Sequence, residues 1–145
     1  SDGPAIAALV VAFRKHLQRA LPSDEDLSRS AAQLIAAPDA EFYVCTVQRQ
    51  TVGYVLQRFR HSMWANGMEA TIEDLFVHPD ARTAGLGRQL VHIALERARE
   101  KQCHSVCLDT NENNTASQRI YTSCGFNSFS SRWNGHQMFF RLHLA

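Results

Sequence analysis

The apolar positions of this sequence recur with two different spacings, which divide the chain into helical and extended segments. Spacings of three and four predict helices over about residues 4–20, 24–37, 86–101 and 115–124. Shorter apolar runs predict strands over residues 41–48, 51–59, 72–77, 105–109, 126–132 and 137–144. The predicted order is therefore two helices, three strands, a helix, a strand, a helix and two strands.

Proline, serine and glycine mark where the predicted helices begin and end. Pro22 should end the first helix, since proline cannot continue a helix interior. Ser23 is a good cap for the second helix, because its hydroxyl can accept a hydrogen bond from a backbone N–H of the first turn. The inner face of this helix is predicted to carry Leu27, Ala31, Leu34 and Ile35. Gly125 suits the left-handed position after the last helix.

Turn signals between the predicted strands define how the sheet is connected. Arg49-Gln50 is a polar turn between the first two strands, and residues 60–67 form a loop that contains Trp64. Asn134-Gly135 is a strong hairpin signal between the last two strands. Strands joined by turns run antiparallel, whereas a helical crossover gives a parallel step. We therefore predict a mixed α/β (α+β) single domain over residues 1–145, with a largely antiparallel sheet and one parallel pair.

Composition narrows the class of protein further. The chain has 145 residues, 45% of them hydrophobic and 20% charged, with a formal net charge of +1. This balance gives no indication of nucleic-acid binding, and no apolar run is long enough to span a membrane. Without a visible secretory signal, we expect a cytoplasmic protein whose four cysteines are reduced. Neither the cysteines nor the histidines have the spacing of a metal site, so we predict none.

The segment after the third predicted strand combines small and basic residues. Pro79 stops the strand near Val77, and Gly85 and Gly87 let the backbone approach a ligand closely because they lack a Cβ. The next helix begins with unpaired N–H groups and the positive end of its dipole. With Arg82 and Arg88 adding positive charge, this loop is predicted to bind a pyrophosphate.

Two separate segments carry recognisable motifs. Residues 82–87, Arg-Thr-Ala-Gly-Leu-Gly, fit the pattern Arg/Gln-x-x-Gly-x-Gly/Ala, and residues 114–126 resemble the pattern Asn-x-x-Ala-x-x-x-Tyr-x-x-x-Gly-Phe. Both patterns, in this order, resemble those of the GNAT family of N-acetyltransferases. Thr83 and Ser117 depart from the usual residues, but both are small. The resemblance implies acetyl transfer from acetyl-CoA to a primary amine. It also implies a third strand splayed from its parallel neighbour.

The resemblance also implies where acetyl-CoA binds. The pantetheine arm would lie in the gap beside the third strand, bonded to the backbone of Phe76 and Val77. Asn114 would contact the same arm. The pyrophosphate would be held by the backbone N–H groups of Arg82, Thr83, Ala84, Gly85, Leu86, Gly87 and Arg88.

Three acidic or phenolic residues are candidates for the chemistry. The resemblance implies that Tyr121 is the general acid that protonates the leaving thiolate, although a tyrosine there could equally just pack on the sheet. Glu73 is the predicted base, and Glu73-Asp74 also resembles the acidic pair of the polyamine acetyltransferase branch. Strand alternation puts these two side chains on opposite faces, so we expect one of them at most to meet the substrate. Trp64 is predicted to wall the acceptor pocket or to cover the sheet.

Several alternatives stay open at this stage. A dinucleotide-dependent oxidoreductase is disfavoured because Leu90 stands where a third small residue is expected. A catalytically silent acyl-CoA sensor is the main competing function. The acceptor is a small cationic amine or a peptide. The C-terminal apolar segment is either core or the interface of a homodimer, and it contains Met138, Phe139, Phe140 and Leu142.

Overall fold

A computed structural model describes residues 2–144, apart from the side chains of Thr83 and Ala84. The chain divides into two compact units, one up to Leu108 and one from Asp109 onward. Each unit is considered by itself, and the single domain predicted over residues 1–145 stays a prediction. Among the described residues, no helix has both the length and the apolar character needed to cross a membrane.

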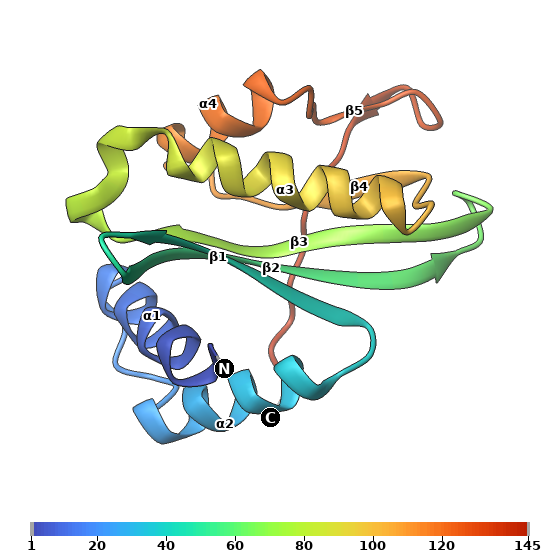
Figure 1. The fold of residues 1–145 in the computed structure, drawn as a ribbon. Helices are drawn as coiled ribbons and strands as arrows, with labels where there is room; N and C mark the ends of the chain where they lie inside the picture. Colours follow the sequence, from blue (N-terminus) through green and yellow to red (C-terminus); the bar gives the residue numbers. More distant parts are fainter. Residues whose placement is uncertain (1, 145) are drawn as a thin grey trace. The chain divides into compact units, whose positions relative to one another are not determined.

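The first unit is a four-stranded sheet covered by helices on both faces. The strand order is β1-β2-β3-β4, and only β3 and β4 run parallel. Helix α3 covers one face, while α1 and α2 cover the other (Figure 1). The elements are α1 (Gly3–His16), α2 (Asp24–Ala36), β1 (Ala40–Val47), β2 (Gln50–Ser62), β3 (Gly67–Val77), a 3-10 turn η1 (Pro79–Ala84), α3 (Leu86–Glu100) and β4 (Ser105–Leu108). The predicted order and the parallel step are confirmed.

The first two helices differ from prediction mainly at their edges. Helix α1 ends at His16, because Gln18 adopts a left-handed φ of 57° well before Pro22. The predicted cap of α2 is confirmed, since the Ser23 hydroxyl accepts a hydrogen bond from the Asp26 N–H at 3.1 Å. Ile35 was predicted on the inner face of α2 but is 44% exposed.

The hairpins of the sheet are longer than predicted. The turn between β1 and β2 lies at Gln48 and Arg49, one residue earlier than expected, and both have positive φ. Strands β2 and β3 stay paired as far as Ser62 and Gly67, so only residues 63–66 of the predicted 60–67 loop form a turn. The ladder continues there because each strand satisfies the backbone hydrogen bonds of the other.

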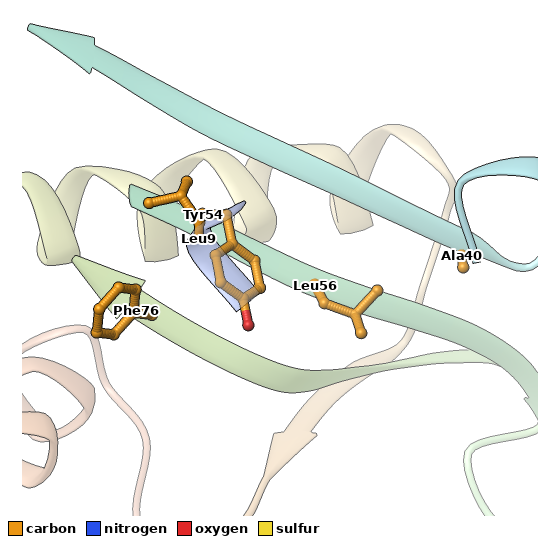
Figure 2. Close-up of a cluster of buried hydrophobic side chains, with 5 residues drawn as sticks. All are labelled: Leu9, Ala40, Tyr54, Leu56 and Phe76. Atoms are coloured by element: carbon orange, nitrogen blue, oxygen red, sulfur yellow. The ribbon is translucent and has the colours of Figure 1, made fainter. Parts of the chain in front are cut away.

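The hydrophobic core has a cluster on each side of the sheet. On the side of α1, one cluster consists of the buried residues Leu9, Ala40, Tyr54, Leu56 and Phe76 (Figure 2). On the other side of β2 and β3, Phe59 and Ala70 are buried with Ala98 of α3. The side chains of β2 alternate between these two clusters. A side chain that contacts a β2 side chain therefore lies on the same face of the sheet.

Helix α3 is anchored to the sheet by apolar packing and one buried polar contact. Leu90, Val91 and Ala94 are fully buried, whereas Ile93 is 43% exposed. Gln57 of β2 is also fully buried and donates from Nε2 to the Ala94 carbonyl at 3.0 Å. This contact satisfies a donor that would otherwise be costly to bury, and it fixes α3 over β2.

The second unit contains a short helix and a small hairpin. Helix α4 (Thr115–Ser123) begins at Asn114, whose Oδ1 accepts a hydrogen bond from the Ser117 N–H at 3.2 Å. Gly125 has a φ of 99°, which confirms the left-handed position predicted after this helix. Strands β5 (Phe129–Ser130) and β6 (Gly135–His136) pair antiparallel, so a hairpin is present, but its turn covers residues 131–134 and Gly135 belongs to β6 instead of to the predicted Asn134-Gly135 turn.

The predicted long strands at the C-terminus are wrong in length. Strand β5 has two residues instead of the predicted 126–132, and residues 137–144 form no strand. Apolar composition favours a strand, but a strand forms only where a neighbouring backbone accepts its hydrogen bonds. The apolar side chains of this segment are 60–88% exposed, which contradicts the core interpretation for Met138, Phe139, Phe140 and Leu142. The homodimer interface stays a prediction.

Candidate active site

Strand β3 has an open edge along its C-terminal half. Its pairing with β4 covers only Glu69–Ile72, whereas its pairing with β2 continues to Val77. Among the described residues, no strand pairs with the β4 side of β3 between Glu73 and Val77. An extended ligand can hydrogen-bond to such an edge as an added strand would. Phe76 and Val77 lie on this open edge, while the splaying of the pair stays a prediction.

A β-bulge in β3 lies at the start of this open edge. Leu56 of β2 pairs with Asp74, but the next residue, Gln57, pairs with Ile72, which leaves Glu73 as an extra residue. In a bulge, two residues of one strand oppose one residue of the other, so the regular alternation of side chains is interrupted. Bulges occur often beside active sites for this reason.

The bulge brings Glu73 and Asp74 to the same face of the sheet. Glu73 contacts Arg58 and Asp74 contacts Tyr54, and both of these β2 residues lie on the face that carries α1 and α2. The prediction that the two carboxylates point to opposite faces is therefore wrong, because it assumed uninterrupted alternation. Contact of either side chain with an acceptor stays a prediction.

Asp74 is held by a buried tyrosine. The Tyr54 hydroxyl donates to Oδ2 of Asp74 at 2.9 Å. Burial raises the pKa of the Asp74 carboxyl above its ordinary value, while the hydrogen bond from Tyr54 acts in the opposite direction. Burial also raises the pKa of Tyr54, so its phenol remains the hydrogen donor. A carboxyl with a raised pKa near an amine site is suited to accept and release a proton.

Glu73 has a different environment from Asp74. Its carboxylate lies 3.5 Å from Arg58, and Arg58 also lies 3.3 Å from Asp39. The side chain of Glu73 is 43% exposed, so this ion pair is open to solvent and weak. The Arg58 guanidinium is thus shared between the carboxylates of Glu73 and Asp39. This face of the sheet therefore keeps negative charge, which would attract a cationic acceptor.

The turn that follows β3 has the backbone features of an anion site. Gly85 precedes α3 with a left-handed φ of 69°, and a Cβ placed there would meet no described atom within 4 Å. The space over the turn is therefore open to a ligand. Helix α3 begins at Leu86, and the first N–H groups of an α-helix generally have no acceptor within the helix. They provide donors for a phosphate.

The two arginines of this loop are placed differently. Arg82 points back toward β3, where Nε donates to the Val77 carbonyl at 2.9 Å and the guanidinium lies 5.9 Å from the Phe76 ring centre. Arg88 lies exposed in the first turn of α3. The side chains of Thr83 and Ala84 are outside the described residues. Phosphate binding by these four residues stays a prediction.

The second unit holds the remaining candidates for the chemistry. Tyr121 is buried in α4, and its ring packs edge-on against Phe126 with centroids 6.0 Å apart. Asn114 caps the same helix with its Oδ1, as noted above, and is exposed. The packing supports the interpretation of Tyr121 as a structural residue without testing its role as an acid. Both roles from the resemblance stay predictions.

Trp64 is not brought to the carboxylates. It lies 78% exposed in the turn between β2 and β3, at the opposite end of β3 from the bulge. Six residues of strand separate Gly67 from Glu73, which corresponds to about 20 Å. Its role in acceptor binding stays a prediction.

The sequence interpretation missed Tyr54. This residue is fully buried inside the apolar run of β2. A buried tyrosine hydroxyl usually has a hydrogen-bond partner, so its position in the middle of a core strand was a signal that a polar group lies nearby. The partner itself follows only from the pairing of β2 with β3.

A separate groove lies between the β1–β2 turn and η1. It has a volume of about 450 Å³ and is lined by Gln48, Thr51, His78 and Asp80, among others. Neither carboxylate of the bulge lines it, nor does Gly85. This groove is therefore distinct from the open edge of β3.

Comparison with known proteins agrees with this geometry. The acetyltransferase (GNAT) family matches residues 10–126, so the chain belongs to this family.

Individual relatives give the range of activities within the family. An aminoglycoside N(6')-acetyltransferase type 1 of Stenotrophomonas maltophilia is 27% identical over 108 residues, which cover 72% of this chain and 70% of that protein. A mycothiol acetyltransferase of Thermobispora bispora is 31% identical over 133 residues, which cover 90% of this chain and 43% of that protein. The crystal structure of an aminoglycoside acetyltransferase from an uncultured soil metagenomic sample, in complex with sisomicin, has a TM-score of 0.79 at 17% identity, covering 99% of this chain and 91% of that one.

These comparisons confirm the fold and the general activity. The mixed α/β acetyltransferase fold is as predicted. Acetyl transfer to an amine is the activity that the family and the relatives by sequence support. The predicted polyamine branch is not confirmed. Family members use acetyl-CoA as the donor, and the open edge of β3 together with the empty space at Gly85 fits an extended ligand that ends in phosphates.

Proposed function

We propose that this protein transfers the acetyl group of acetyl-CoA to a primary amine of a small molecule that carries several positive charges. The observation that carries the proposal is the bulge in β3, which places Glu73 and Asp74 on one face beside the open edge. Acidic surfaces attract cationic ligands and raise their local concentration. Relatives named for aminoglycosides support the same class of acceptor.

The open edge would position the donor. Bound acetyl-CoA supplies a thioester whose carbonyl carbon accepts a nucleophile. The backbone of Phe76 and Val77 would hold the pantetheine arm, and the N–H groups from Gly85 to Arg88 would hold the pyrophosphate. Asn114 would contact the same arm.

The carboxylates of the bulge would receive the acceptor. An ammonium group is not a nucleophile, so a base must take a proton from it before attack. Glu73, partly neutralised by Arg58, would hold the cation by charge, and one of the two carboxylates would accept the proton. Tyr121 would protonate the leaving thiolate, and a Tyr121→Phe variant with unchanged turnover would exclude this role.

A panel of acceptors tests the proposal. With acetyl-CoA at saturation, kcat/KM is measured for sisomicin, for spermidine and for a neutral peptide with a free N-terminus. We expect the two polycations to be acetylated at least about tenfold more efficiently than the peptide, and this preference should shrink at high salt because charge attraction is screened. A preference for the peptide would overturn the small-cation proposal. Binding of acetyl-CoA without transfer to any amine would favour the silent sensor.

A further inference from the structure

The ring of Tyr54 is fixed by aromatic neighbours. Its centroid lies 6.5 Å from that of Phe13, 6.0 Å from that of Phe42 and 6.5 Å from that of Phe76, and the residue is fully buried. The ring lies in the cluster of Figure 2, with its hydroxyl directed toward β3. A phenol held in this way has one orientation for its donor.

The Tyr54 hydroxyl donates its hydrogen bond to one oxygen of Asp74. Its bond to Oδ2 is 2.9 Å, and among the described residues no other side chain donates to this carboxyl. Asp74 pairs in register with Leu56, so its side chain lies on the same face as Tyr54, where the hydroxyl can reach it. The bond to Tyr54 therefore sets the direction in which the second oxygen, Oδ1, can face.

We propose that Tyr54 is a positioning residue that holds Asp74 as the proton acceptor for the amine. The proposal rests on the proposed function, and it assigns to Asp74 the step that the sequence assigned to Glu73. Glu73 is less suited to this step, since its carboxylate is already paired with Arg58. Asp74 has a neutral partner that leaves its negative charge in place.

The reaction releases one proton for each acetyl group transferred. The Asp74 carboxylate takes one proton from the substrate ammonium and becomes a carboxylic acid, which later releases this proton to solvent. The neutral amine forms the new C–N bond to the thioester carbon, and the C–S bond breaks with its electron pair on sulfur. Tyr121 gives its proton to the thiolate sulfur. The second proton lost by the nitrogen then restores the Tyr121 phenol. The products are an amide, the CoA thiol and one released proton.

The charged groups around Asp74 are few. From β3 itself Glu73 lies next to it, and from β2 Arg58 lies beside Glu73. On α1, Arg14 bonds to Asp24 and His16 to Arg82. Strand β4 has no ionisable residue besides Cys107. Burial and the Tyr54 hydroxyl thus act on the pKa of Asp74 in opposite directions. Without the Tyr54 hydroxyl, burial alone acts on the pKa of Asp74, which should then rise further.

A Tyr54→Phe variant tests the proposal without an acceptor. The pKa of Asp74 is measured by carbon NMR of its carboxyl in the free protein, and we expect it to rise by about 1 unit, since a hydrogen bond to a charged group is lost. The ring stays in place, so the fold is retained. Tyr43→Phe is the matched control, because the Tyr43 hydroxyl contacts Glu41 and Gln57 instead. An unchanged Asp74 pKa in Tyr54→Phe would overturn the proposal.

Kinetics then separate positioning from a purely structural role. The acidic limb of the kcat/KM profile for sisomicin should move to higher pH in Tyr54→Phe, because a base with a higher pKa is protonated sooner as the pH falls. In an Asp74→Asn background, Tyr54→Phe should cause no further loss. If sisomicin is not acetylated at all, the proposed acceptor is wrong and the NMR titration still decides the role of Tyr54. An equal loss in both backgrounds would show that Tyr54 does not act through Asp74.

Discussion

Replacement of Asp74 by Asn is expected to lower kcat for acetyl transfer by about 10²- to 10⁴-fold, the usual loss when a general base is removed. Asparagine has nearly the same shape and can still accept the hydrogen bond that Tyr54 donates. The substitution therefore removes the proton acceptor while it preserves the packing of the bulge. Steady-state release of the CoA thiol, followed with saturating acceptor, measures the effect.

Glu73→Gln is the matched control for this experiment. It removes the neighbouring carboxylate of the same bulge, whose partner is Arg58. We expect it to raise KM for a cationic acceptor by about tenfold or less, because it weakens an exposed charge contact, and to leave kcat nearly unchanged. The opposite pattern, with Glu73→Gln nearly inactive and Asp74→Asn active, would show that Glu73 is the base, as the sequence predicts.

Replacement of Gly85 by Val is expected to impair acetyl-CoA binding most strongly among changes in the loop. Gly85 has a φ of 69°, which a β-branched residue adopts only at a cost of about 1–3 kcal/mol. The new side chain would also occupy the open space over the turn. We expect KM for acetyl-CoA to rise by about tenfold or more, equivalent to about 1.4 kcal/mol of binding free energy, and the free energy of unfolding to fall.

Gly85→Asn separates the two causes. Asparagine tolerates the left-handed backbone conformation, so strain is small, but its side chain still enters the space that the ligand would use. KM for acetyl-CoA should therefore rise while thermal stability stays near that of the unchanged protein. An unchanged KM in Gly85→Asn would mean that no ligand approaches the backbone at this turn.

The order of elements could be predicted because it depends on local patterns. Helical spacing, the Ser23 cap and the left-handed glycine at Gly125 are properties of short segments, and the structure confirms them. The parallel step between β3 and β4 followed from the helix that connects them. The positions Phe76 and Val77, by contrast, came from the resemblance to the family and not from these local patterns.

The bulge could not be predicted, because it is a property of a strand pair. Nothing in Ile72-Glu73-Asp74 distinguishes a regular strand from one with an extra residue. The shift appears only where Leu56 and Gln57 pair with Asp74 and Ile72. The prediction of long C-terminal strands was wrong for a related reason. Residues 137–144 have the composition of a strand, but they form none. Both errors concern pairing between segments that are distant in sequence.

The direction of Arg82 illustrates a second limit of the sequence. A basic residue beside a glycine-rich turn favours a phosphate contact, yet this side chain bonds to Val77 and approaches His16 of α1. A long side chain selects among partners that the fold brings near, and the sequence did not indicate α1 as one of them.

Amide chemical shifts in a titration with CoA test most directly where this protein binds its donor. Uniformly labelled protein is titrated with CoA, and the backbone amide signals are followed by NMR. We expect the largest changes along the open edge, from Asp74 to Val77, and at the turn from Gly85 to Arg88. Changes confined to the groove at Gln48, Thr51 and His78, with the open edge unaffected, would contradict the assignment of this site.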